Sequence, residues 1–109
     1  MSRIDNYTFI AVAYRGEGEI ESFEQAKTFW VYGLEGKKIK KRQLLSLYAE
    51  NGSAQIEEFC SSVIDVAICR NFGSRAMARL RQKGMRLFTY EGGCDAAVKK
   101  YLAGELKEL

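Results

Sequence analysis

Two cysteines, Cys69 and Cys94, are the residues of this 109-residue chain best suited to metal chemistry. Each comes at or just after the end of an expected strand and beside a glycine-containing turn. A thiolate is the usual protein ligand of iron–sulfur clusters, and a nearby helix N-terminus favours its ionised form. Cys69 is equally explained as a small buried residue at a strand end, whereas Cys94, in a polar turn, is expected to be exposed. Two thiolates are fewer than the four of the usual cluster cage, so a cluster here would need ligands from a partner or would bind labilely.

The turn that follows Cys69 carries the elements of an anion-binding site. Backbone N–H groups, a helix N-terminus, a hydroxyl and two guanidinium groups would together suit a phosphate, a carboxylate or an anionic metal–sulfur cluster. The residues that would contact such a ligand are Arg70, Asn71, Gly73, Ser74 and Arg75. The alternative is an ordinary strand-to-helix turn with solvated arginines, since neither common phosphate-loop glycine spacing is present.

Histidine is absent from the chain. Its absence excludes histidine-based catalytic triads, histidine general bases and histidine-containing zinc sites. Hydrolysis of the ribonuclease H type needs several acidic side chains on the sheet to hold two metal ions, and the expected first strand, residues 7–14, has none. We therefore expect a protein without enzymatic activity.

Length and charge indicate a single domain, residues 1–109, with neither a nucleic-acid nor a membrane partner. The net charge of +3 is milder than that of most basic nucleic-acid-binding modules. No run approaches the about 20 apolar residues that cross a bilayer. Residues 1–6 lack the apolar segment of a secretory signal, so we expect a cytoplasmic protein with reduced cysteines.

The strand pattern predicts an α/β fold. Apolar runs near residues 7–14, 28–32 and 38–48, joined by short turns, indicate an antiparallel meander. Residues 65–106 then alternate strand and helix, which indicates parallel strands with helical crossovers. The order βββαβαβα gives a mixed five-stranded sheet with helices packed on it, the connectivity of a ribonuclease H-like fold.

Helix signals complete this pattern. The first predicted helix has an apolar stripe that comprises Ile56, Phe59, Cys60 and Val63. Ser53 and Ser74 are candidate N-caps for the first and second helices, and Gly84 is a candidate C′ residue.

Several short motifs occur in a fixed order along nearly the whole chain. They are Ile-Ala-Val-Ala at 10–13, Phe-Trp-Val-Tyr at 29–32, Asp-Val-Ala-Ile-Cys at 65–69, Phe-Gly-Ser-Arg-Ala at 72–76, Leu80, Gly-Met at 84–85 and the ending 96–106. In this order they resemble the dinitrogenase iron-molybdenum cofactor biosynthesis family, whose small NifX-like domain also ends NifB-type proteins. The most specific pieces are the Gly-Ser-Arg-Ala turn and the Tyr-Leu-Ala-Gly-Glu-Leu ending.

The resemblance implies a ribonuclease H-like fold without nuclease activity. It also implies binding or carriage of an iron–sulfur or iron–molybdenum cluster, or of a precursor, with a metallocluster assembly or acceptor protein as partner. Many members carry His-Phe-Gly after the first loop, where the histidine would serve as a ligand. Here Ser22 stands in its place.

Two other functions stay open at this stage. The missing histidine favours a protein-interaction or regulatory module, whose contact surface would be the basic run 37–42, although lysines also protect edge strands from aggregation. A small-anion-binding protein, with its site at the helix start near Ser74, would need neither cysteine. A homodimer is compatible with the sequence.

Overall fold

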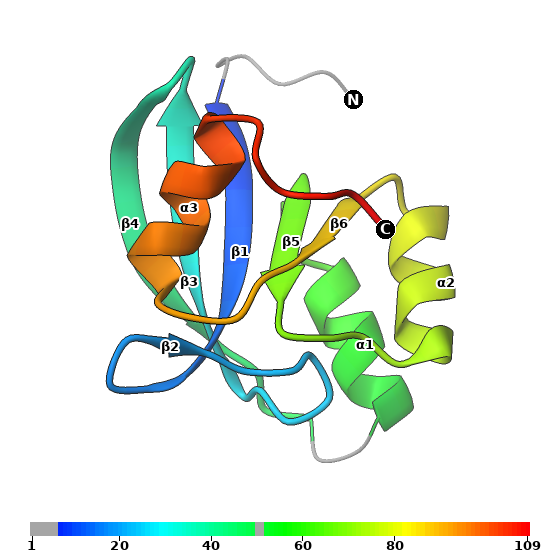
Figure 1. Ribbon diagram of the computed structural model, residues 1–109. Coiled ribbons are helices and arrows are strands. Elements are labelled where there is room, and N and C mark those ends of the chain that lie inside the picture. Colours follow the sequence, from blue (N-terminus) through cyan, green and yellow to red (C-terminus); the bar gives the residue numbers. More distant parts are fainter. Residues whose placement is uncertain (1–6, 50–51) are drawn as a thin grey trace.

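The structure is a computed structural model that describes residues 7–49 and 52–109. A run of strands comes first, and helices and strands then alternate, as Figure 1 shows. Their bounds are β1 Tyr7–Gly16, β2 Glu19–Ile20, β3 Thr28–Glu35, β4 Lys38–Ser46, α1 Gly52–Cys60, β5 Val66–Cys69, α2 Ser74–Gln82, β6 Arg86–Thr89 and α3 Cys94–Leu102. Within the described ranges, no helix is long and apolar enough to cross a membrane.

One mixed sheet organises the chain around β1. The strand order is β4-β3-β1-β5-β6, and β2 pairs with the end of β1. β1, β3 and β4 pair antiparallel, whereas β1, β5 and β6 pair parallel. The predicted meander and the predicted parallel half are both confirmed.

The predicted count of five strands is wrong, because β2 makes the sheet six-stranded. Glu19 and Ile20, which lie between the first two predicted strands, fold back on β1, with Ile20 opposite Tyr14. Two residues beside a glycine-rich turn are too few to show a strand pattern in the sequence.

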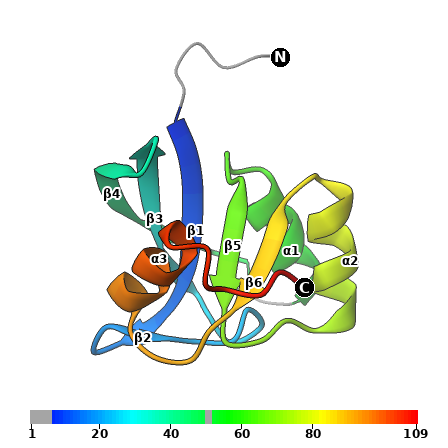
Figure 2. The same ribbon diagram turned by 45° about the horizontal axis from the view of Figure 1, so that its top comes forward.

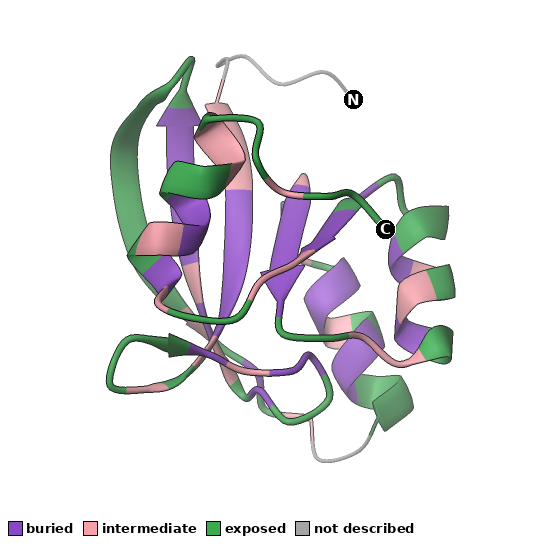
Figure 3. Cartoon of the chain, in the orientation of Figure 1, coloured by how far each residue is buried: buried purple, intermediate pink, exposed green. Residues whose placement is uncertain are grey.

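Each face of the sheet has its own apolar cluster. Successive side chains of a strand point to opposite faces. Ala11 and Ala13 therefore join the cluster covered by α1 and α2, while Ile10 and Val12 join the cluster covered by α3. Figure 2 shows α3 on one side of the sheet and α1 with α2 on the other. In Figure 3, β5 is buried throughout and β1 is buried in its middle, whereas β4 is exposed almost from end to end.

The helix ends differ in part from the predictions. α1 begins at Gly52 and ends at Cys60, so Ser53 lies inside the helix and Val63 lies beyond it, 61% exposed. The N-cap of α2 is Gly73, not Ser74, and no side chain caps it. Gly84 follows the C-cap of α2 with φ +89°, the left-handed conformation that glycine adopts most readily, and is the predicted C′ residue.

Two members of the predicted helix stripe, Phe59 and Val63, provide a test of this fold. Phe59→Ala removes ring contacts to Phe23 and Phe29, whose centroids lie 5.3 and 4.7 Å from that of Phe59. We expect it to lower the free energy of unfolding by about 3–5 kcal/mol. Val63→Ala, at an exposed position, should change it by less than about 0.5 kcal/mol. Chemical denaturation of both variants measures the difference, and equal losses would contradict the observed end of α1.

Candidate functional site

The candidate site lies at the carboxyl end of the parallel strands. β5 ends at Cys69 and β6 at Thr89, and each leads through a glycine-containing turn into a helix. The Tyr90 N–H donates to the Cys69 carbonyl at 3.1 Å, so the two turns leave the sheet side by side. Ligands of such sheets bind outside the carboxyl ends of the strands. Both glycine-containing turns therefore lie at one end of the sheet.

Residues 18–26, here called the crossing segment, run from β2 toward β3 across both turns (Figure 1). Four backbone hydrogen bonds attach this segment to the turns. They run from the Cys94 N–H to the Gly18 carbonyl (2.7 Å), from the Ile20 N–H to the Gly92 carbonyl (2.9 Å), from the Arg70 N–H to the Glu21 carbonyl (2.9 Å) and from the Phe23 N–H to the Asn71 carbonyl (3.0 Å). The carboxyl end of the sheet is therefore covered by the chain itself.

Two acidic side chains of the crossing segment occupy the predicted anion site. The Gly73 N–H, at the N-cap of α2, donates to Glu24 Oε2 at 2.7 Å. An added Cβ at Gly73 would lie 2.7 Å from the same oxygen, so the carboxylate approaches closely because position 73 is glycine. Arg70 forms an ion pair with Glu21 at 3.3 Å. The N-terminus of α2 and one of the two arginines are thus already neutralised by the carboxylates of Glu24 and Glu21.

A buried side chain of α1 also holds the crossing segment in place. Gln55 of α1 is buried, and its side-chain amide donates to the carbonyls of Phe23 and Ala26 at 3.0 and 2.8 Å. Ser22, at the place of the family histidine, is 7% exposed, and its N–H donates to Glu21 Oε1 at 2.8 Å. Opening this end of the sheet requires these contacts to change.

Both candidate ligand thiols are buried. Cys69 is fully enclosed in the cluster packed by α1 and α2, and burial raises the pKa of its thiol well above the usual value. Cys94 is 3% exposed, so the expectation that it is exposed is wrong. As the first residue of α3, Cys94 points back to the sheet, and its thiol donates to the Ala13 carbonyl at 3.9 Å. Burial, with a smaller contribution from Asp95, raises the pKa of Cys94 to about 11.

The two thiols lie in the clusters on opposite faces of the sheet. Cys69 belongs to the α1–α2 cluster and Cys94 to the α3 cluster, yet both adjoin the backbone of Ala13. Over residues 7–49 and 52–109, no three cysteine, aspartate or glutamate side chains gather closely enough to hold a metal ion. Joint binding of one cluster by both thiols requires this end of the sheet to rearrange.

The predicted anion-contacting residues divide into two groups. Arg70, Asn71, Gly73 and Ser74 remain together in the turn beside the crossing segment. Arg75 turns away from them, because its guanidinium donates to Ser53 Oγ of α1 at 3.2 Å.

The acidic partners of the site were not predicted. Glu21 and Glu24 belong to a loop whose acidic residues also include Glu17 and Glu19, whereas the turn after Cys69 is basic. The opposite charges of these two loops at strand ends were the sequence signal that could have predicted their contact. A second unpredicted contact, from the Tyr32 hydroxyl to Asp95 Oδ1 at 2.8 Å, ties β3 to the start of α3.

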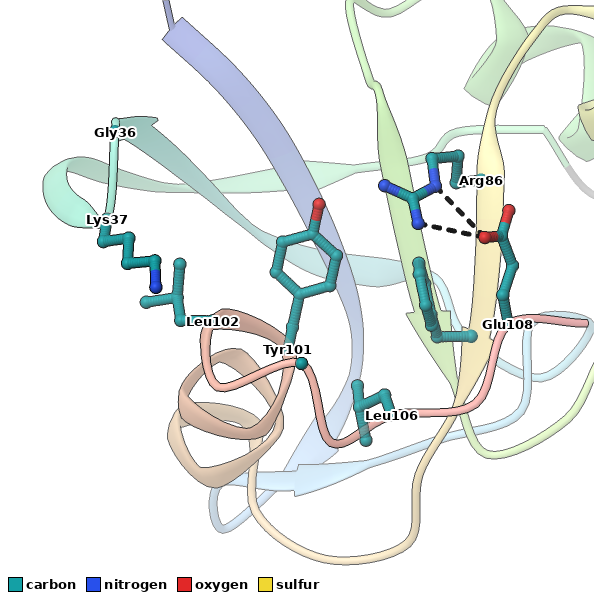
Figure 4. Close-up of a pocket in the computed structure, with 9 residues that line it drawn as sticks. Gly36, Lys37, Arg86, Tyr101, Leu102, Leu106 and Glu108 are labelled. Carbon is teal, nitrogen blue, oxygen red and sulfur yellow. Dashed lines mark hydrogen bonds and ion pairs between the residues drawn. The ribbon is translucent and has the colours of Figure 1, made fainter.

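A cavity of about 490 Å³ lies at the other end of the sheet (Figure 4). It opens between the β3–β4 turn, the end of α3, the start of β6 and the final residues, where Arg86 pairs with Glu108 at 3.0 Å. None of the predicted site residues lines it.

The burial of Cys94 predicts an unusual pH dependence of its alkylation. Because only the thiolate reacts, the rate with iodoacetamide should rise about tenfold per pH unit from pH 7 to 10. The pKa of about 11 keeps the thiolate fraction growing over this whole range. An unperturbed thiol, with a pKa of about 8.5, levels off above pH 9. Peptide mass spectrometry measures the rates, with the denatured chain as control; a plateau near pH 9 in the native protein would contradict the buried placement.

Solved structures share this fold at low sequence identity. The apo form of the orange protein from Desulfovibrio gigas superposes with a TM-score of 0.78 at 20% identity, covering 96% of this chain and 95% of that one. A Methanocaldococcus jannaschii protein provisionally named a dinitrogenase gives 0.77 at 18%, covering 94% and 95%. A Thermotoga protein provisionally named NifB gives 0.73 at 20%, covering 94% and 93%.

The sequence itself identifies the family. No curated protein matches the chain. The family profile described as dinitrogenase iron-molybdenum cofactor matches residues 7–104, which include every strand and helix of the structure. The chain therefore belongs to the dinitrogenase iron-molybdenum cofactor family.

Proposed function

We propose that this chain, of ribonuclease H-like connectivity, is a non-enzymatic accessory or carrier protein of metallocluster assembly. Its cargo would be an iron–sulfur or iron–molybdenum-type cluster, or a precursor, delivered to an assembly or acceptor protein in the cytoplasm. The observation that carries the proposal is the Glu24 carboxylate on the Gly73 N–H. This contact and the ion pair of Glu21 with Arg70 support the inference that the carboxyl end of the sheet can bind anions.

The cargo would replace the acidic side chains of the crossing segment. With Glu24 and Glu21 displaced, the Gly73 N–H, the Arg70 guanidinium and the neighbouring Asn71 and Ser74 would face an anionic cluster. Arg75 would join them by leaving Ser53. Arginine and the helix N-terminus would neutralise cluster charge, as they now neutralise carboxylate charge.

Cys69 and Cys94 would supply the coordinate bonds. Each thiol loses its proton when it binds a metal, and in the closed form burial opposes this loss. Exposure on displacement of the crossing segment would lower both pKa values toward the usual range. Displacement of the crossing segment and deprotonation of the two thiols would therefore occur together.

Features of the sheet support a role without catalysis. Two-metal hydrolysis needs acidic side chains grouped on the strands, and β1 contains none. Asp65 precedes β5 at the opposite end from the glycine turns, where its carboxylate accepts the Phe9 N–H at 2.8 Å. It is far along the strand from the proposed cargo site.

Anaerobic reconstitution with iron and sulfide tests the proposal directly. We expect a coloured species with iron bound in fixed stoichiometry, visible by absorption spectroscopy and metal analysis. The Cys69→Ala Cys94→Ala double variant should lose it while keeping the native circular dichroism spectrum. Cys60→Ala, at a third buried cysteine outside the site, is the matched control and should load normally. A folded, colourless, metal-free wild-type protein would overturn the proposal and favour the interaction module.

Removing the internal carboxylate should help the cargo to bind. Glu24→Ala frees the Gly73 N–H, and we expect cluster occupancy at limiting iron and sulfide to rise, with affinity improving by up to roughly tenfold, about 1.4 kcal/mol. The same change removes a favourable charge from the start of α2 and should lower stability by about 0.3–1 kcal/mol. Glu105→Ala, which removes another exposed carboxylate, paired with Lys100, is the control. Weaker loading of Glu24→Ala than of this control would show that Glu24 does not compete with the cargo.

A further inference from the structure

β4 is a long edge strand with one side open. Among the described residues it pairs with β3 alone, from Lys38 to Ser46, with a register shift that leaves Lys40 outside the residue pairs. Of the nine residues of β4, Leu45 is half-buried and the other eight are exposed. An edge strand presents a row of unpaired N–H and C=O groups to any chain that can lie beside it.

The strand also concentrates the positive charge of the protein. Five of the 17 cationic side chains lie within residues 37–42, and the remaining 12 are outnumbered by the 14 acidic ones. Lys40 approaches Glu35 at 3.9 Å, the one ion pair of this run within the part of the chain that the structure describes. The outer side of β4 is therefore a positively charged surface, whereas the rest of the protein carries a small net negative charge.

Aromatic rings fix the cations on both faces of the strand. The Arg42 guanidinium lies 4.1 Å from the centroid of Trp30, on the α3 side of the sheet. The Lys41 ammonium lies 5.1 Å from the centroid of Tyr7. Single-stranded nucleic acids bind sheets by stacking bases on free aromatic faces, and here the cations cover these rings. This arrangement favours a peptide over a nucleic acid.

Apolar side chains continue the surface beyond the charges. Ile39 and Leu44 are 47% and 51% exposed, and each lies opposite a β3 residue of the α3 face. A strand beside β4 would cover both. Cross-strand pairs of opposite charge and of apolar side chains stabilise a sheet, whereas like charges placed opposite each other destabilise it. A second copy of β4 would bring lysines against lysines in a parallel, in-register pair and Arg42 against Arg42 in a full antiparallel pair, so the strand is poorly suited to pairing with itself.

We propose that β4 is the docking site for an extended acidic segment of a partner protein, which adds to the sheet as a further strand. The segment carries glutamate or aspartate where it faces Lys38, Lys40 and Lys41, and apolar residues where it faces Leu44. Backbone hydrogen bonds supply affinity, and the basic half of β4 selects an acidic sequence. This docking site is separate from the proposed cargo site, because β4 and the β5–β6 turns belong to opposite halves of the sheet.

Fluorescence anisotropy with two labelled nine-residue peptides tests the proposal. Each has a half rich in glutamate and a half of alternating valine and threonine, and the two differ in the order of the halves, since the strand direction is not fixed. We expect one order to bind at low salt and to weaken as salt rises. The Lys38→Glu Lys40→Glu variant should bind at least roughly tenfold more weakly, because two attractive pairs become repulsive. Lys99→Glu Lys107→Glu has the same net charge and is the matched control, expected to bind like the wild type.

Backbone methylation separates strand addition from simple charge attraction. Alternate residues of an added strand point their N–H groups toward β4 and away from it. Of two peptides N-methylated at alternate positions, one should lose binding and the other should keep it. Equal binding of both would overturn strand addition. Failure of both peptides to bind, or equal displacement by single-stranded DNA of matched charge, would overturn the acidic-peptide proposal. Neither result depends on cluster loading.

Discussion

The parallel pairing of β1 with β5 is the constraint on which the rest of the structure depends. β1 is hydrogen-bonded to β3 on one side and to β5 on the other, and the residues from Ile10 to Ala13 have no exposed surface. A shift of one residue in this register would send the two alanines to the α3 face and Ile10 and Val12 to the α1–α2 face. The aromatic packing around Phe59 and the helix α3 each fit one of these faces only. The same pairing brings the carboxyl ends of β1 and β5 together, where Ala13 adjoins both thiols.

Those parts of the fold that depend on local periodicity were predictable from the sequence. The meander, the alternation of strand and helix and the C′ glycine of α2 all follow from patterns within a few residues. Val63 departed from the prediction because α1 ends at Cys60, and a stripe of apolar residues does not show where a helix ends. Cys94 departed because it begins α3 and does not lie in the turn before it. A difference of one residue in the helix start moved its thiol from solvent to the sheet.

The location of the candidate site was predictable from the sequence, but its coverage by the crossing segment was not. The glycine turns lie together as topology requires, whereas the crossing segment joins residues far apart in the chain; Glu24 and Gly73 are separated by 49 positions. A net charge of +3 gives no sign that an acidic loop meets a basic turn. The basic run 37–42 is readable in the sequence, whereas the contact between the acidic loop and the basic turn becomes visible only when the strands are placed side by side.

The closed carboxyl end explains how a carrier could be stable both empty and loaded. A helix N-terminus and an arginine left without anions beside two buried thiols would destabilise the empty protein, and the glutamates of the crossing segment remove that difficulty. A single carboxylate offers each of these groups one negative charge, whereas a metal–sulfur cluster offers several charges together with bonds to sulfur. Under the proposed function, the cargo would therefore displace the crossing segment although this segment is part of the same chain. Release would follow in the reverse direction: when an acceptor withdrew the cluster, Glu21 and Glu24 would return, the thiols would regain their protons, and the site would close without leaving an exposed thiolate to be oxidised.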